Sequence, residues 1–212
     1  MQSLKQKGFT LVEIAIVLVI VGLLIGGVLK GQEMITNAKL KRVESDNAGI
    51  AAAMFSYQDR YLQLPGDDDS ADTRFTIFNG QAATINGNSN GSIEGDWVAA
   101  ADTETANFWK HLRAAGLIPG GGNDDTQPTN AYGGNIGLRD GSLQIAGHVT
   151  IFGSIEGPIA TIIEARLDDG DPISGRIQSD ITEAAMNATQ TDSSVATGVY
   201  ADSARYFMAF RL

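Results

Sequence analysis

The feature that most constrains this chain is a long apolar run close to its amino terminus. Residues 9–29 read FTLVEIAIVLVIVGLLIGGVL, in which Thr10 and Glu13 are the only polar side chains. About 20 apolar residues in a helix span the hydrocarbon core of a bilayer. The run therefore predicts a helix that spans a membrane or is covered by other apolar protein surface.

Two simple interpretations of the run are incomplete. A secretory signal peptide has an apolar stretch of about 7–15 residues and a small-residue cleavage site, and no A-x-A-like site follows this run. A plain membrane anchor fits the length but does not explain Glu13. A carboxylate in hydrocarbon costs about 2.5–3.5 kcal/mol. Glu13 is therefore expected to be functional and to have a partner.

The amino-terminal residues resemble the type III signal of type IV pilins and type II secretion pseudopilins. A short leader containing Lys5 and Lys7 ends at Gly8, and the sequence FTLVE follows it. The resemblance implies that a prepilin peptidase cuts between Gly8 and Phe9. It also implies that Phe9 is then N-methylated and that Glu13 is needed for assembly.

Elementary electrostatics agrees with the role that the resemblance gives to Glu13. Cleavage would leave a cationic amine on Phe9, and in a helical stack this amine would meet Glu13 of a neighbouring subunit. Each charge would then be neutralised where water is scarce. The pair would also fix the axial register between subunits. The leader would block this pairing until it is removed.

The apolar pattern continues beyond the run and predicts one helix over about residues 9–61. No proline precedes Pro65, and apolar residues recur at helical spacing on one face. At 1.5 Å per residue this helix would be about 80 Å long. The positions on its apolar face are Ile35, Val43, Ile50, Met54, Tyr57, Tyr61 and Leu64.

Four glycines lie in the middle of this predicted helix, and each costs a helix up to about 1 kcal/mol relative to alanine. One interpretation is that they soften the helix, so that it unwinds locally in a polymer; filaments of the resembled family are often partly unwound here, and many pilins carry a proline in this stretch. The other is close helix–helix contact in a membrane. The glycines are Gly22, Gly26, Gly27 and Gly31.

The remainder of the chain predicts an α+β domain. A helix is expected over residues 103–115, with Thr103 as N-cap and Gly116 as the stop. Alternation predicts strands over residues 143–152 and 206–212, and residues 159–167 favour a short helix. The resemblance implies a pilin-like ladle, in which the long N-terminal helix packs on a small antiparallel β-sheet with long loops.

Four segments follow from these patterns. The boundaries are a prepilin leader peptide at 1–8, a transmembrane or filament-core half-helix at 9–30, an amphipathic half-helix at 31–62 and an exported acidic globular domain at 63–212. The charge distribution supports the last of these, because 22 of the 25 acidic but only 9 of the 15 basic side chains follow residue 45. An acidic surface repels nucleic acid, so no nucleic-acid partner is expected.

The chain contains no cysteine. This excludes disulfides, thiolate metal sites and cysteine nucleophiles. Many type IV pilins close their C-terminal region with a disulfide, so this chain must hold its C-terminal segment by strand pairing or by an ion.

Two segments rich in amide or carboxylate side chains are candidates for binding calcium. No other cofactor is expected. The segment from Asn86 has the donor spacing of an EF-hand-like loop, but Trp97 stands where a bidentate Glu belongs. The alternative is turn chemistry, since Asn and Asp favour turns by bonding their own backbone. The calcium candidates are Asn86, Asn88, Asn90, Ser92, Glu94, Asp168, Asp169 and Asp171.

No catalytic constellation frames a nucleophile, so the expected function is structural rather than enzymatic. The leading interpretation is a pilin or pseudopilin that polymerises into a type IV pilus-like filament, or fimbrium. The alternative is a minor subunit that acts as a tip adhesin in cell adhesion or as a type II secretion adaptor. A membrane-anchored enzyme or binding domain is the third.

The resemblance also implies where the chain resides and what it meets. The chain is expected in the inner membrane before assembly and in an extracellular or periplasmic filament afterwards. The partners implied are the membrane, the prepilin peptidase, the inner-membrane platform protein, the assembly ATPase, and copies of itself or sibling pilins.

Overall fold

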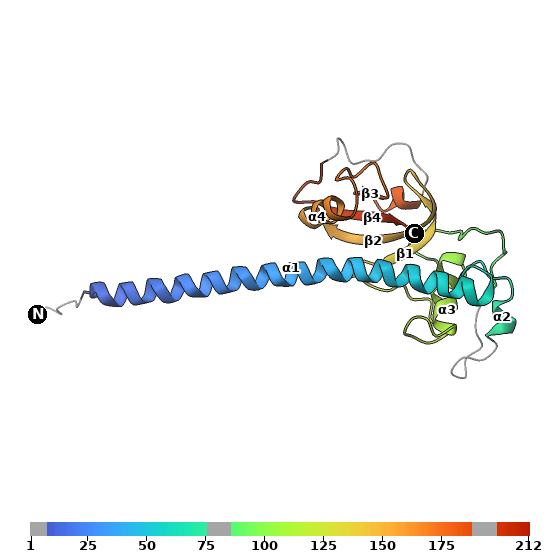
Figure 1. Ribbon diagram of the computed structural model, residues 1–212, viewed down its shortest axis with the longest axis horizontal. Helices are drawn as coiled ribbons and strands as arrows, with labels where there is room; N and C mark the ends of the chain where they lie inside the picture. The colour runs from blue at the N-terminus through green and yellow to red at the C-terminus, as the bar shows by residue number, and fades with distance from the viewer. Residues whose placement is uncertain (1–7, 76–85, 188–198) are drawn as a thin grey trace, which may run out of the picture. The chain divides into compact units, whose positions relative to one another are not determined.

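The computed structural model of the chain describes residues 8–75, 86–187 and 199–212. The chain divides into two compact units, Met1–Lys41 and Arg42–Leu212. Helix α1, Leu11–Tyr61, begins in the first unit and ends in the second, and Figure 1 shows it as one uninterrupted ribbon. The predicted α+β class is confirmed, since the second unit combines helices with a small antiparallel sheet.

Helix α1 ends where the sequence predicted. The amide of Leu62 donates a hydrogen bond to the Gln58 carbonyl at 2.8 Å, and Leu62 itself adopts a left-handed conformation with φ of 59°. A left-handed residue after the last turn is a common way to end a helix. Pro65 and Gly66 follow and turn the chain away, because a proline cannot continue a helix.

Within the second unit, the later part of α1 packs its apolar face against the domain. The Thr150 hydroxyl on the sheet donates to the side-chain oxygen of Asn47, and Arg166 pairs with Glu44 at 3.1 Å. Ile35 belongs to the first unit, so its place on the apolar face stays a prediction. The predicted apolar positions that are buried are Val43, Ile50, Met54, Tyr57 and Leu64.

The sheet has four antiparallel strands in the order β1-β2-β4-β3. Strand β4 therefore lies between two partners: Phe210 faces Thr150 of β2 on one side and Ile177 of β3 on the other. Strand pairing, one of the two ways expected to hold the cysteine-free C-terminal segment, is therefore present, and an ion stays a prediction. The strand bounds are Ile136–Ser142 (β1), Ile145–Glu156 (β2), Ile177–Asp180 (β3) and Arg205–Arg211 (β4).

The strand predicted over residues 143–152 is confirmed in its centre but wrong at both ends. Leu143 lies in the tight turn that joins β1 to β2, where Ser142 faces Ile145, and its φ of 53° is left-handed. A hairpin turn of two residues needs such a conformation. At the other end β2 continues to Glu156, with an irregular register between Phe152 and Ile155.

The two predicted helices of the domain are confirmed. Helix α3 is Glu104–Ala114, and its N-cap Thr103 accepts a hydrogen bond from the Ala106 amide through its side chain. Helix α4 is Gly157–Leu167 and follows β2 directly. Two short elements were not predicted, namely α2, Ala71–Arg74, and the 3-10 helix η1, Ala184–Asn187.

A buried aspartate joins the end of α1 to the segment that follows it. Asp68 is 0% exposed and accepts hydrogen bonds from the Tyr57 hydroxyl at 2.6 Å and from the Ser70 amide at 2.9 Å. Arg74 also pairs with this carboxylate. Burial raises the pKa of the Tyr57 phenol above its usual value, so the hydroxyl keeps its proton and remains a donor to Asp68.

Removal of this donor should destabilise the fold. Tyr57→Phe leaves the ring in place but takes one hydrogen bond from a buried carboxylate, a loss that costs about 1–3 kcal/mol. Denaturant unfolding of the wild type and the variant, followed by tryptophan fluorescence, measures the difference.

Tyr61→Phe is the matched control for this experiment. Tyr61 stands one turn later on α1 and packs edge to face on Tyr57, but no hydrogen bond of its hydroxyl is found among the described residues. The control should unfold within a few tenths of a kcal/mol of the wild type, on the order expected for a surface change. Equal midpoints for both variants would show that the bond to Asp68 contributes nothing.

Candidate functional site

The amino-terminal end of α1 is closed by a reciprocal pair of hydrogen bonds between Thr10 and Glu13. The Glu13 amide donates to the Thr10 hydroxyl oxygen at 3.2 Å, and the Thr10 amide donates to the Glu13 carboxylate at 2.8 Å. The Thr10 hydroxyl donates to the same carboxylate oxygen at 2.8 Å. This arrangement is a capping box, in which two amides without helical partners are satisfied at once.

The predicted processing residues lie immediately before this cap. Gly8 and Phe9 are exposed and have no regular secondary structure, and Phe9 is 84% exposed. An exposed, non-helical peptide bond is accessible to a peptidase. The structure thus brings Gly8, Phe9 and Glu13 into one short segment at the start of the helix.

The first half of α1 presents apolar side chains that the chain itself does not cover. Between Leu11 and Leu29 the large apolar side chains are 44–85% exposed, and this part of the helix is long and apolar enough to cross a membrane. An apolar surface of this extent marks a membrane or protein contact. It fits anchoring in a membrane before any assembly.

The four central glycines lie inside the uninterrupted helix α1. Apart from its chain neighbours and the nearby backbone of α1 itself, a methyl group built at any of them would have no described atom within 4 Å. Packing within the chain therefore does not require glycine here. Softening of the helix and contact with other helices both stay predictions for Gly22, Gly26, Gly27 and Gly31.

The asparagine-rich loop uses its side-chain oxygens to hold its own backbone. The Asn86 oxygen accepts from the Asp72 amide at 2.9 Å, the Asn88 oxygen from the Asn90 amide at 3.0 Å, and the Asn90 oxygen from the Ser92 amide at 2.8 Å. The last two are Asx turns. These contacts favour the turn interpretation of the loop.

Four further hydrogen bonds of the same loop agree with that interpretation. The Ser92 hydroxyl donates to Asp140 at 2.5 Å, and the Glu94 carboxylate accepts from the Asn90 side chain at 2.9 Å. The amides of Asn90 and Gly91 donate to the buried Asp67 carboxylate at 3.1 and 2.7 Å. Converging amides of this kind hold an anion rather than a cation.

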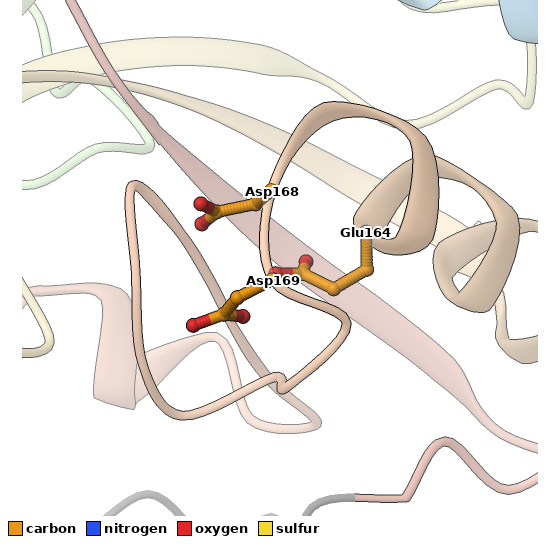
Figure 2. A group of neighbouring side chains, drawn as sticks. All are labelled: Glu164, Asp168 and Asp169. Atoms are coloured by element: carbon orange, nitrogen blue, oxygen red, sulfur yellow. The ribbon is translucent and has the colours of Figure 1, made fainter.

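A second group of the predicted residues is brought together at the end of α4. One oxygen atom from each of Glu164, Asp168 and Asp169 lies within 4.8 Å of the other two. In Figure 2 the Glu164 side chain extends from the last turns of α4 toward the two aspartates. Sequence reasoning found the aspartates, but it missed Glu164 and included Asp171, which is not a member of this group.

The two aspartates of this acidic triad are held in place by the loop that follows α4. Asp168 accepts hydrogen bonds from the amides of Arg176 and Ile177, the second at 2.7 Å. Asp169 accepts from the Ser174 hydroxyl at 2.6 Å and from the Asp171 amide at 2.9 Å. The loop therefore closes on itself around these carboxylates.

Glu164 is the buried member of the acidic triad, with 0% of its side chain exposed. The Tyr200 hydroxyl lies 3.1 Å from its Oε2 atom, whereas its Oε1 atom has no hydrogen-bond partner among the described residues. Burial, with the charges of Asp168, Asp169 and Asp171, raises the pKa of Glu164 to about 8. Such a group needs either a proton or a cation at neutral pH.

Comparison with known proteins identifies the amino-terminal segment. Residues 3–29 match the family model of the prokaryotic N-terminal methylation motif. The match supports a type IV pilin-like prepilin signal, as the resemblance of the sequence predicted. No curated protein and no solved structure matches the chain.

The capping box makes a local prediction about the start of α1. The first amides of a helix have no intrahelical partner, so the Glu13 amide depends on the Thr10 hydroxyl. Thr10→Val keeps the shape of the side chain and removes this bond, at a cost of about 0.5–2 kcal/mol to the first turn. Hydrogen exchange of the Glu13 amide, measured by NMR on the full chain in micelles, should become faster.

Ser56→Ala is the control for this measurement. The Ser56 hydroxyl donates to the Ala52 carbonyl on the same helix at 2.6 Å, far from the cap, so its removal should leave the Glu13 amide unchanged. Unaltered exchange in Thr10→Val would show that the cap does not order the first turn.

Proposed function

We propose that the chain is the precursor of a structural subunit that is cleaved after Gly8 and then polymerises into a type IV pilus-like filament. The observation that carries this proposal is the methylation motif over residues 3–29, on a helix whose apolar surface the chain leaves uncovered. The motif is typical of structural subunits rather than enzymes, so the proposal assigns no reaction to the chain.

The exposed apolar surface gives the physical reason for polymerisation. In the precursor a lipid bilayer covers this part of α1. After extraction from the membrane, only the helices of other subunits can replace the lipid, because the described part of the chain offers nothing that does so. A filament with these helices at its centre satisfies this requirement.

Glu13 supplies the specificity of the contact. In the precursor its carboxylate accepts hydrogen bonds from Thr10, which satisfies its oxygen but leaves its charge unpaired. Cleavage creates an amine on Phe9, and N-methylation keeps that amine cationic. Pairing of the amine with Glu13 of a neighbouring subunit compensates both charges and sets the register of the stack.

The remaining assignments rest on the same signal. The leader is 1–8, the filament-core half-helix 9–30, the amphipathic half-helix 31–62 and the exported domain 63–212. The prepilin signal implies processing by a prepilin peptidase and assembly with pilin machinery. We place the platform protein, the assembly ATPase and sibling pilins among its partners, and the finished filament outside the inner membrane.

The abundance of the chain in sheared fibres distinguishes its two candidate roles. A chain that dominates these fibres is a major pilin, whereas a chain present only in trace amounts is the tip adhesin or secretion adaptor.

Substitution of Gly8 should stop processing. Gly8→Leu puts a branched side chain at the cleaved bond, and the peptidase should leave the chain uncut in the membrane. Intact-mass spectrometry of the membrane fraction should then show the precursor but not the mature chain that begins with N-methylated Phe9.

Gly22→Ala controls for a general effect of losing a glycine. A methyl group at Gly22 meets no atom of the chain and lies well away from the cleaved bond, so this variant should be cut normally. A mature-sized chain produced from Gly8→Leu would show that the cleavage assignment is wrong.

Glu13→Gln separates the charge of this residue from its capping role. Glutamine still accepts the hydrogen bond of a capping box, so the helix should begin as before and the leader should be removed. The variant has no charge for the Phe9 amine, and we expect a processed subunit that stays in the membrane. Electron microscopy of sheared material, with mass spectrometry of the amino terminus, measures both steps.

Glu33→Gln removes a charge of the same kind from the same helix. Glu33 is exposed and pairs with Lys30 at 2.8 Å, a contact that contributes little at a surface. This control should form filaments in wild-type amounts. If Glu13→Gln also did so, charge pairing would not drive assembly.

A further inference from the structure

We propose that Glu164, Asp168 and Asp169 form a binding site for a divalent hard cation, with Ca²⁺ as the ion that suits it best. The site lies at the end of α4 and is independent of the proposed function, since it shares no residue with the amino-terminal signal. Its carboxylates come from two elements, the helix and the loop that leads to β3.

The spacing of the three carboxylates fits such an ion. One oxygen from each residue lies within 4.8 Å of the others. Calcium binds oxygen ligands at about 2.3–2.6 Å, so two ligands on opposite sides of the ion are separated by about 5 Å. The separations of the three oxygens are therefore of the size that one bound ion requires.

Glu164 provides the observation that points to a ligand. Its carboxylate is fully buried, yet its Oε1 atom has no hydrogen-bond partner among the described residues, and Figure 2 shows the side chain directed at Asp168 and Asp169. A buried oxygen without a partner is costly. A cation in the triad would satisfy this atom and balance the charges around it.

Among residues 8–75, 86–187 and 199–212, no ion pair brings a basic side chain to these carboxylates instead. None of the ion pairs found in the described ranges includes a member of the acidic triad. Three carboxylates that close to one another repel strongly when all are ionised. A divalent ion removes most of this repulsion in a single binding event, whereas one proton neutralises only one of the three charges.

The loop holds the site in a form that is ready to bind. The amides of Arg176 and Ile177 fix the Asp168 carboxylate, and Gly175 passes so close to it that a methyl group there would overlap its oxygens. Gly175 also has a left-handed φ of 79°. A side chain at this position would displace Asp168, so glycine is required for the loop to close.

The chemistry of the donors selects the class of ion. Carboxylate oxygens suit hard cations, and the site has both a buried and an exposed carboxylate, so water and loop carbonyls can complete its coordination. Ca²⁺ accepts six to eight oxygen ligands in flexible geometry, whereas Mg²⁺ demands a near-ideal octahedron. An irregular site shared between a helix end and a loop therefore favours Ca²⁺.

Binding would connect the end of α4 and the loop that directly follows it to one segment that is distant in the sequence. The ion would join the end of α4 to the loop before β3. Through the hydrogen bond from the Tyr200 hydroxyl to Glu164 at 3.1 Å, it would also reach the segment that enters β4. The ion would thus act as a cross-link in a chain that has no cysteine.

The test uses the full chain in detergent micelles after treatment with EDTA. Tb³⁺ replaces Ca²⁺ in oxygen sites and emits when a nearby tyrosine is excited, and Tyr200 is in contact with the site. Titration with Tb³⁺ should give saturable emission that Ca²⁺ removes at lower concentration than Mg²⁺. Calorimetry with Ca²⁺ alone should show one site, and Ca²⁺ should raise the melting temperature.

Variants locate the site. Glu164→Gln and Asp169→Asn each remove one ligand charge with little change of shape, and each should weaken Tb³⁺ and Ca²⁺ binding by about tenfold or more. Asp171→Asn is the matched control in the same loop, and its affinity should stay within about threefold of the wild type, as expected for a charge outside the coordination sphere.

The melting temperature in EDTA separates loss of binding from loss of fold. Glu164→Gln should melt at or above the wild-type temperature without Ca²⁺, because it removes a buried charge, and Ca²⁺ should no longer raise it. Asp169→Asn removes an exposed ligand instead of a buried one, and Ca²⁺ should likewise no longer raise its melting temperature. Absence of binding to the folded wild type, or equal losses in Glu164→Gln, Asp169→Asn and Asp171→Asn, would overturn the proposal.

Discussion

The structure depends on the apolar surface of the first half of α1, which a single chain does not bury. The large apolar side chains between Leu11 and Leu29 are 44–85% exposed, and the proposed function covers them first with lipid and then with other subunits. This constraint explains why one carboxylate at Glu13 is so informative. A charge in that stretch is unfavourable in every medium that suits its neighbours, unless a partner of opposite charge arrives with the next subunit.

Sequence patterns predicted helices α1, α3 and α4 and the last strand because the signal for each is local. Helix α3 has its N-cap at Thr103, and β4 alternates along its own length. Strands β1 and β3 were missed for a physical reason. Ile136–Ser142 contains two glycines and two charged residues, and Ile177–Asp180 has only four residues. Neither would form a strand alone, and both are strands because β2 and β4 pair with them. Such pairing is not visible in a local pattern.

The candidate sites divide in the same way. Gly8, Phe9 and Glu13 could be proposed as a site from the sequence because they lie in one short segment. The cap at Thr10 could also have been predicted, since a threonine three residues before a glutamate is the signature of a capping box. Glu164 could not. It is a single acidic residue in an apolar helix, and its burial depends on Tyr200, which lies 36 residues later in the chain. Only the folded domain shows that its second oxygen lacks a partner.

Glu13 and Glu164 therefore pose the same physical problem at two scales. Each is a carboxylate in surroundings that disfavour its charge. One carboxylate oxygen of each accepts a hydrogen bond, from Thr10 in Glu13 and from Tyr200 in Glu164. Hydrogen bonds orient a carboxylate, but they do not cancel its charge, so each site still lacks a cation. Under the proposed function, the cation for Glu13 comes from another chain, and the contact would then be a condition of assembly. For Glu164 the neighbouring carboxylates of Asp168 and Asp169 make a small divalent ion the better match than an amine, because one ion can contact all three oxygens at once.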